Sequence, residues 1–189
     1  MRPFFAFNLK NKILFSSLAV IMLVSVCIAL VARYILISSL TRELEFRGLG
    51  IASSIADRST GLILTQDRAN LISQVFEEAL LGERRNLVSY IFILDPEHNV
   101  LASTFLQPFP NELRKAHILP AGRAQSIKLI NVFNISAYDV AVPVKEGIYD
   151  VGSVHVGLSK EHIDSVVGQL RMAFLGFIAG IIIIMFFIS

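Results

Sequence analysis

Two long uncharged runs of apolar residues lie near the two ends of the chain, at residues 13–32 and 172–189. A helix rises 1.5 Å per residue, so about 20 apolar residues cross the roughly 30 Å hydrocarbon core of a bilayer. Both runs are long enough to do so, the second only just. We therefore predict transmembrane helices over 13–32 and 172–189, with a polar domain, 33–171, between them. The second run still has the composition of a membrane span where the sequence stops, so we expect that span to be cut short there.

Apolar residues continue at helical spacing beyond the first run, without a proline before Pro96. They are Leu36, Leu40, Leu44, Ile51, Ile55 and Leu62. This spacing predicts one long helix that emerges from the membrane and ends at about Leu64, with a kink or break near Gly61. A second helix follows, for which Thr65 is the predicted N-cap and Gly82 the predicted C-cap.

The pattern then changes to short segments rich in aromatic and β-branched residues, which are typical of strands. These segments are 90–94, 100–105, 127–133, 136–145 and 150–159. Glu146-Gly147 predicts a tight hairpin between the last two, and the proline-bounded connector allows a short helix at 111–116. From Lys160 the helical spacing returns and leads into the second apolar run. Helices followed by consecutive strands indicate an α+β fold with a five-stranded antiparallel sheet and an exit helix.

Charge decides the expected orientation in the membrane. Arg2, Lys10 and Lys12 precede the first run without any acidic residue, so the positive-inside rule places residues 1–12 in the cytoplasm and 33–171 outside it. The alternative is a cleaved signal peptide, but the run exceeds the usual apolar region of about 7–15 residues and no clear cleavage site follows it. The segment between the spans is nearly neutral, which argues against nucleic acid as a partner. Cys27 is the single cysteine, so no intrachain disulfide forms.

The order of elements resembles the extracytoplasmic PAS-like sensor of bacterial membrane receptors, the PDC or single Cache family. The resemblance covers residues 33–171 and rests on the long helix and four strand motifs. These motifs are Tyr90-Ile91-Phe92-Ile93-Leu94-Asp95, Val100-Leu101-Ala102-Ser103-Thr104, Val140-Ala141-Val142-Pro143-Val144 and Val151-Gly152-Ser153-Val154-His155-Val156-Gly157-Leu158-Ser159. It implies an inner-membrane homodimer that responds to a small molecule or a periplasmic protein. The full-length protein is then expected to be a two-component sensor histidine kinase, whose kinase part is absent from this chain.

In the family that this chain resembles, a ligand pocket lies on one sheet face beneath the irregular connector. Mapped onto this sequence, its expected lining is Tyr90, Phe92, Thr104, Phe105, His117, Arg123, Lys128, Asn131 and Tyr138. A cationic side chain there suits a carboxylate ligand, because it supplies charge-assisted hydrogen bonds. Ser103-Thr104 stands where relatives that bind dicarboxylates often carry a basic residue or a histidine, which argues against such a ligand.

No motif predicts catalysis or a cofactor, and the four histidines do not have the spacing of a zinc site. We therefore predict a chain without catalytic residues, cofactor or metal.

Gly176 and Gly180 form a G-x-x-x-G in the second run, and Ser25 and Ala29 form a weaker small-x-x-x-small pair in the first. Such pairs let helix backbones approach closely, so we expect packing within a dimer or between the two spans of one chain. Two other functions remain open: a scaffolding protein of the cell envelope, or the sensor part of a chemoreceptor or a diguanylate cyclase.

Overall fold

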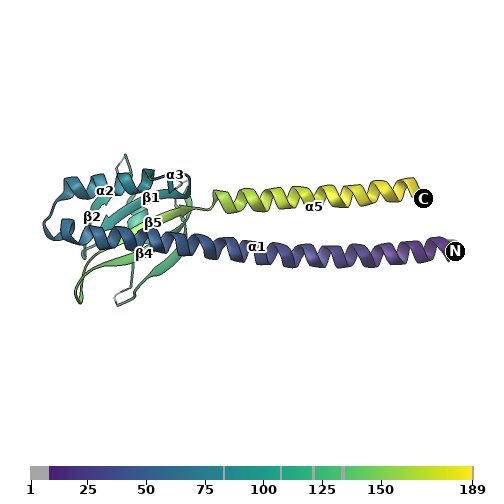
Figure 1. The fold of residues 1–189 in the computed structure, drawn as a ribbon, viewed down its shortest axis with the longest axis horizontal. Helices are drawn as coiled ribbons and strands as arrows, with labels where there is room; N and C mark the ends of the chain where they lie inside the picture. The colour runs from purple at the N-terminus through teal and green to yellow at the C-terminus, as the bar shows by residue number, and fades with distance from the viewer. Residues whose placement is uncertain (1–8, 83, 107, 121, 133–134, 189) are drawn as a thin grey trace. The chain divides into compact units, whose positions relative to one another are not determined.

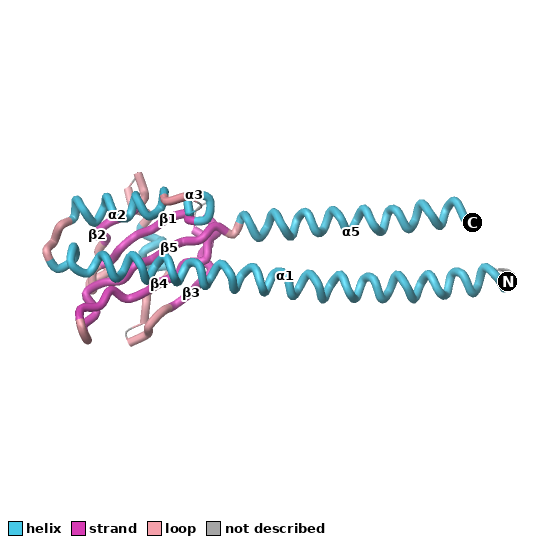
Figure 2. Tube along the Cα trace, in the orientation of Figure 1, coloured by secondary structure: helices cyan, strands magenta, loops and turns pink. Residues whose placement is uncertain are grey.

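The computed structural model describes residues 9–82, 84–106, 108–120, 122–132 and 135–188 (Figure 1). Most of the expected cytoplasmic segment, 1–12, lies outside these residues. The chain divides into two compact units, one made of residues 1–39 and 166–189 and the other of Leu40–Ser165. The first unit is entirely helical where it is described, and the second contains the sheet (Figure 2).

Helix α1, Leu9–Leu64, belongs to both units and is continuous. Its end at Leu64 confirms the predicted boundary, whereas the break expected near Gly61 is not found. A single glycine costs a helix only about 1 kcal/mol, which is too little to interrupt α1 beside the buried residues Ile55, Ala56 and Ser59. Helix α5, Glu161–Ile188, follows the last strand and corresponds to the predicted exit helix and second run.

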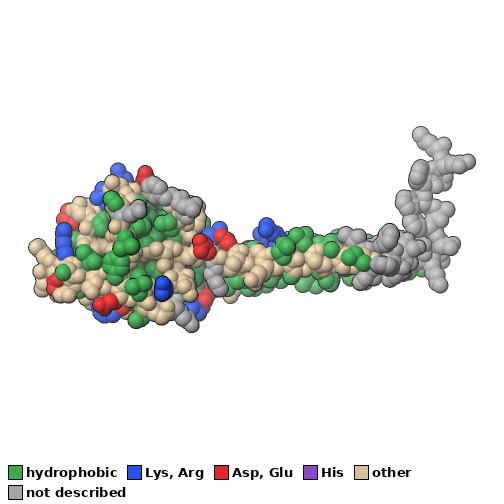
Figure 3. Space-filling model, turned by 90° about the horizontal axis from the view of Figure 1, so that it is seen from above, with side chains coloured by type: hydrophobic (Ala, Val, Ile, Leu, Met, Phe, Trp, Pro, Cys, Tyr) green, Lys and Arg blue, Asp and Glu red, His purple; other side chains and the backbone are tan. Residues whose placement is uncertain are grey.

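The helical unit has a surface suited to lipid. Val20, Leu23 and Ile28 on α1 and Met172 on α5 are each at least 58% exposed. Figure 3 shows hydrophobic side chains covering most of the described helical surface, while most of the charged side chains lie on the other unit. Two helical segments, Ala19–Leu64 and Ile163–Gly180, are long and apolar enough to cross a membrane by length and composition.

Helix α2, Arg68–Leu80, begins later than predicted. Its N-cap is Asp67, whose side chain accepts a hydrogen bond from the backbone nitrogen of Asn70, so the prediction of Thr65 was wrong. Thr65 instead closes α1, because its hydroxyl donates to the carbonyl of Gly61 at 2.8 Å. Gly82 follows the C-terminal end of α2 with a φ of +51°, a conformation that favours glycine. A short helix, α3, covers Arg84–Leu87 and was not predicted.

The five strands form one antiparallel sheet in the order β2-β1-β5-β4-β3, which confirms the predicted α+β class. The short helix α4, Asn111–Ala116, interrupts the connector between β2 and β3 at the predicted residues. The strands are β1 Val88–Leu94, β2 Val100–Ser103, β3 Ser126–Val132, β4 Ile135–Glu146 and β5 Tyr149–Ser159.

The two faces of the sheet have different covers. One face packs against α1 so closely that a Cβ at Gly48 would lie 2.5 Å from Cδ1 of Leu158. The opposite face is covered by α4 and the rest of the connector. The core on this connector-covered face consists of Tyr90, Phe92, Leu94, Leu113, Ile130 and Ala137. The candidate site lies in this second layer.

Candidate functional site

The register of the sheet places a charged residue in the middle of the connector-covered face. Asp139 on β4 pairs with Gly157 on β5 on one side and with Lys128 on β3 on the other. Gly157 in turn pairs with Tyr90 on β1. Because directly opposed residues in antiparallel strands share a face, these four residues form one row across the sheet.

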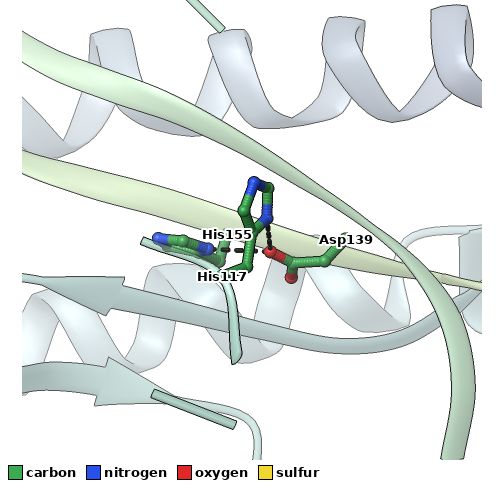
Figure 4. Close-up of side chains that lie close together, drawn as sticks. All are labelled: His117, Asp139 and His155. Atoms are coloured by element: carbon green, nitrogen blue, oxygen red, sulfur yellow. Dashed lines mark hydrogen bonds and ion pairs between the residues drawn. The ribbon is translucent and has the colours of Figure 1, made fainter. Parts of the chain in front are cut away.

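Two histidines meet at Asp139 (Figure 4). Nδ1 of His117, which directly follows α4, lies 2.6 Å from Oδ2 of Asp139. Nδ1 of His155 on β5 lies 2.9 Å from the same oxygen. The His117 and His155 rings are nearly perpendicular, at 89°, with their centroids 5.7 Å apart. The connector and the two strands of the β4–β5 hairpin therefore bring two imidazoles onto one carboxylate oxygen.

The second nitrogen of each ring is held by a serine hydroxyl. Nε2 of His117 lies 2.8 Å from Oγ of Ser126 on β3, and Nε2 of His155 lies 3.3 Å from Oγ of Ser153 on β5. A hydroxyl can donate or accept, so these contacts are compatible with either neutral tautomer of the histidines. Both rings are thus fixed at both nitrogens.

The cluster is enclosed, with exposed fractions of 4% for His117 and 0% for Asp139 and His155. Burial by itself would raise the pKa of Asp139, but the hydrogen bonds from His117 and His155 act in the opposite direction, and the net result is a lowered pKa. Asp139 therefore carries its negative charge inside the protein at neutral pH.

Tyr90 lies across Gly157. A Cβ on Gly157 would sit 2.3 Å from Cζ of the Tyr90 ring, so only glycine leaves room for it. Burial first, and then the negative charge of Asp139, raise the pKa of Tyr90. The Tyr90 hydroxyl and Oδ1 of Asp139 are both buried, and the interaction of the hydroxyl with this carboxylate contributes to the raised pKa of Tyr90.

Aromatic side chains close the site from the β1 side and from the connector. The Phe92 ring stacks on His155 with centroids 4.5 Å apart and an interplanar angle of 8°. Phe109 meets Phe92 edge-on, and Phe105 stacks with Tyr90. This packing holds the His155 ring in place and excludes water from the carboxylate.

The structure divides the nine residues expected to line a pocket into three sets. Tyr90, Phe92, Phe105 and His117 do converge beneath the connector, where the aromatic side chains pack on one another. Thr104 instead bonds the backbone of Ile91, with its Oγ1 accepting from the nitrogen at 3.0 Å.

The polar members of the expected lining lie toward solvent. Arg123 is exposed in the loop after α4. Lys128 is exposed as well, and its Nζ donates to the carbonyl of Ala116 at 2.7 Å. Asn131 is exposed and accepts from Ser136, and Tyr138 lies on the opposite face of β4 from Asp139. The structure does not bring these four to the cluster.

A cleft of about 490 Å³ lies elsewhere, between the C-terminal end of α1, the start of α2 and the ends of β1 and β5. It contains none of the residues expected to bind a ligand. Its lining is Leu62, Ile63, Gln66, Arg68, Leu71, Asp95, Pro96, Leu101 and Val151.

Sequence reasoning identified His117 but not Asp139, His155 or the two serines. A signal was present: Asp139 and His155 occupy the alternate positions of two strands whose other positions are valines and a leucine. Polar residues on a face that must be covered are a sign of a buried polar cluster. Within the described residues, His117, Asp139 and His155 are also a set of metal-ligating types whose ligand atoms lie within 4.8 Å of one another.

The small residues of the predicted spans lie on α1 and α5. A Cβ added at Gly176 or Gly180 would meet no described atom within 4 Å, so their face of α5 is open in the single chain. Ser25 and Ala29 on α1 are partly exposed.

The fold and the covered sheet face are those of a PAS-like sensor domain. The sequence model of the family described as Single cache domain 3 matches residues 36–172, and the chain belongs to this family. No curated protein sequence matches the chain significantly.

Two solved structures are similar to this chain at low sequence identity. The periplasmic domain of Vibrio cholerae LuxQ is 21% identical with a TM-score of 0.50, over 68% of this chain and 63% of that one. The sensor domain of E. coli DcuS is 18% identical with a TM-score of 0.47, over 69% of this chain and 96% of that one.

Proposed function

We propose that the chain is the sensing and membrane-spanning part of a bacterial inner-membrane receptor. Residues 33–171 form the extracytoplasmic sensor, residues 13–32 and 172–189 the two spans, and residues 1–12 a cytoplasmic segment. The output is a two-component histidine kinase that follows the second span.

One observation carries this proposal: each apolar helix is continuous with an element of the sensor domain. Helix α1 runs from Leu9 to Leu64, so the helix that packs on the sheet is the same one that contains the first apolar run. Strand β5 ends at Ser159 and α5 begins at Glu161, so only Lys160 separates the sheet from the second helix. A change in the sheet therefore reaches the second span along the chain through Lys160, and the first span through the packing of α1 on the sheet.

A stimulus acts on such a receptor by binding one conformation of the sensor better than the other. It shifts the population by no more than the ratio of its affinities for the two. The chain supplies no catalytic group of its own in this proposal, and the phosphotransfer chemistry belongs to the output domain.

Cysteine labelling tests the proposed topology. In a Cys27→Ser background, Ile148→Cys places a thiol in the β4–β5 turn, where Ile148 is 87% exposed, and Lys10→Cys places one before the first span. We expect a membrane-impermeant maleimide to label Ile148→Cys in intact spheroplasts and Lys10→Cys only after permeabilisation. The reverse pattern, or equal labelling of both, contradicts the proposal.

The natural reading frame after codon 189 tests the output. A phosphoacceptor-histidine helix pair and an ATP-binding domain support the kinase. A stop codon or a short tail supports a scaffolding protein, and a cyclase domain or a long signalling coiled coil supports the other receptor classes.

A further inference from the structure

We propose that His117, Asp139 and His155 form a binding site for a divalent first-row transition-metal cation such as Zn²⁺, and that its occupancy is an input of the sensor. The binding rests only on the geometry of the cluster. Its use as an input rests on the function proposed above.

The donor set decides the class of cation. Two imidazole nitrogens and one carboxylate oxygen suit zinc and its neighbours in the first transition row, whereas Ca²⁺ and Mg²⁺ prefer oxygen ligands throughout. Around tetrahedral Zn²⁺, nitrogen and oxygen ligands at about 2.0–2.2 Å lie roughly 3.3–3.5 Å from one another. The two Nδ1–Oδ2 distances are 2.6 Å for His117 and 2.9 Å for His155, so the ligand atoms need to separate by about 0.7–0.9 Å and about 0.4–0.6 Å respectively.

The serine contacts prepare both rings for a metal. Histidine ligands almost always donate their second N–H to an outer partner that fixes the ring and its tautomer. Without a cation, each Nδ1–H donates to Asp139 and each Nε2 can accept from its serine. With a cation on Nδ1, the proton of each ring moves to Nε2 and donates to Ser126 or Ser153. This change of tautomer reverses the direction of the hydrogen bond between each histidine and its serine without breaking it. A neutral ring loses no proton in the change.

Two buried polar atoms lie beside the cluster. They are Oδ1 of Asp139, which neither histidine contacts, and the hydroxyl of Tyr90, whose pKa the neighbouring Asp139 helps to raise. A buried carboxylate is costly unless cations or donors compensate it, and both histidines of the cluster contact the same oxygen, Oδ2. A bound cation places positive charge directly beside the carboxylate.

The ligands come from two layers of the fold. Asp139 and His155 lie on adjacent central strands, while His117 lies on the connector. Displacement of the connector alone opens the cluster to a cation, and coordination then fastens the connector to the sheet. His155 is on β5, the strand that leads directly into α5, so this closure acts on the element that continues into the second span.

Zn²⁺ and Co²⁺ titrations of the full chain in detergent, purified without a polyhistidine tag, test the site. We expect one ion per chain and the visible d–d bands of a low-coordinate Co²⁺ centre with nitrogen and oxygen ligands. The variants His117→Gln, Asp139→Asn and His155→Gln keep the side-chain size and should abolish the bands. His98→Asn is the matched control, because His98 lies in the β1–β2 turn with a φ of +63° that asparagine tolerates.

Two further variants leave all three ligands in place. Ser126→Ala and Ser153→Ala should each weaken Zn²⁺ binding by about 10–100-fold, as loss of an outer partner does at other histidine sites. They keep the proposal testable if a ligand variant fails to fold, which circular dichroism reports. A folded wild-type chain that takes up no more metal than His155→Gln overturns the site.

Output is measured separately with residues 1–189 fused to the cytoplasmic part of a characterised kinase. Zinc-dependent phosphorylation that His117→Gln removes supports the input role. Zinc binding without any change in output overturns that role and leaves the binding site and the topology of the receptor standing.

Discussion

Gly157 is the residue on which the connector-covered layer depends, because the Tyr90 ring occupies the space of its missing side chain. A Cβ there would lie 2.3–2.5 Å from three ring atoms of Tyr90. The ring is fully buried and stacked on two phenylalanines, so it cannot swing aside freely. We expect Gly157→Ala to destabilise the domain by about 1–3 kcal/mol through overpacking, measured by urea unfolding of the full chain in detergent.

Gly50→Ala is the control for this prediction. Gly50 is an exposed position inside α1, and a Cβ there would meet no described atom within 4 Å. Alanine should leave stability unchanged or raise it by up to about 1 kcal/mol, because it favours the helix. Equal stability of the two variants would show that the Tyr90 ring moves without cost.

The cluster around Asp139 shows why single residues of a site escape sequence reasoning. The β4–β5 hairpin starts with Glu146 opposite Tyr149, but a bulge between Val144 and Lys145 shifts the register by one. Only after this shift does Asp139 stand opposite Gly157, which makes it a diagonal neighbour of His155. A one-residue slip reverses the faces of a strand, and nothing in the alternation specifies the bulge. The position of His117 depends in addition on the path of an irregular connector.

At the scale of elements, the sequence predicted correctly those helices and strands whose hydrophobic periodicity and segment length are strong signals. The end of α1 at Leu64, the bounds of α4 and the five strands were predicted to within about two residues. The errors lie at element ends, where one side-chain contact decides the outcome: Asp67 and not Thr65 caps α2. The short helix α3 has too few residues to show a period.

The buried carboxylate of Glu78 links helices α1, α2 and α3 of the sensor domain through ion pairs. Glu78 on α2 is 5% exposed and forms ion pairs with Arg58 on α1 and Arg84 on α3. Glu78→Gln keeps the shape but removes the charge that both arginines share. We expect the free energy of unfolding to fall by about 1–3 kcal/mol, because the variant loses two ion pairs to a buried carboxylate. The loss stays in this range because Arg58 is half exposed and can be hydrated instead.

The matched change is Glu43→Gln, also on α1. Glu43 pairs with Arg47 at 2.8 Å, but both side chains are more than half exposed. Such pairs are worth little, so this variant should change stability by less than about 0.5 kcal/mol. A similar loss in both variants would mean that burial of Glu78 adds nothing to its ion pairs.

At the scale of the whole molecule, the sensor domain and the spans were predicted from different properties. The spans follow from apolar length, which is readable in the sequence, and the domain follows from the order of helices and strands. The association of two chains depends on surfaces that one chain does not show. In the single chain the Gly176 and Gly180 positions meet no described atom, so an intramolecular use of this pair has no support in the structure.

We therefore expect the open glycine face of α5 to pack against the same face of a second chain in the membrane. Close approach of two backbones requires small residues, so Gly176→Ile with Gly180→Ile should abolish most of the association measured by energy transfer between labelled chains in bilayers. Phe174→Ile is the control: it introduces the same residue, and at 100° per residue position 174 lies on the opposite side of the helix from the two glycines. If the glycine variant associates like the wild type and Phe174→Ile does not, the dimer uses the other face of α5. If neither change has an effect, contacts between the sensor domains hold the two chains together.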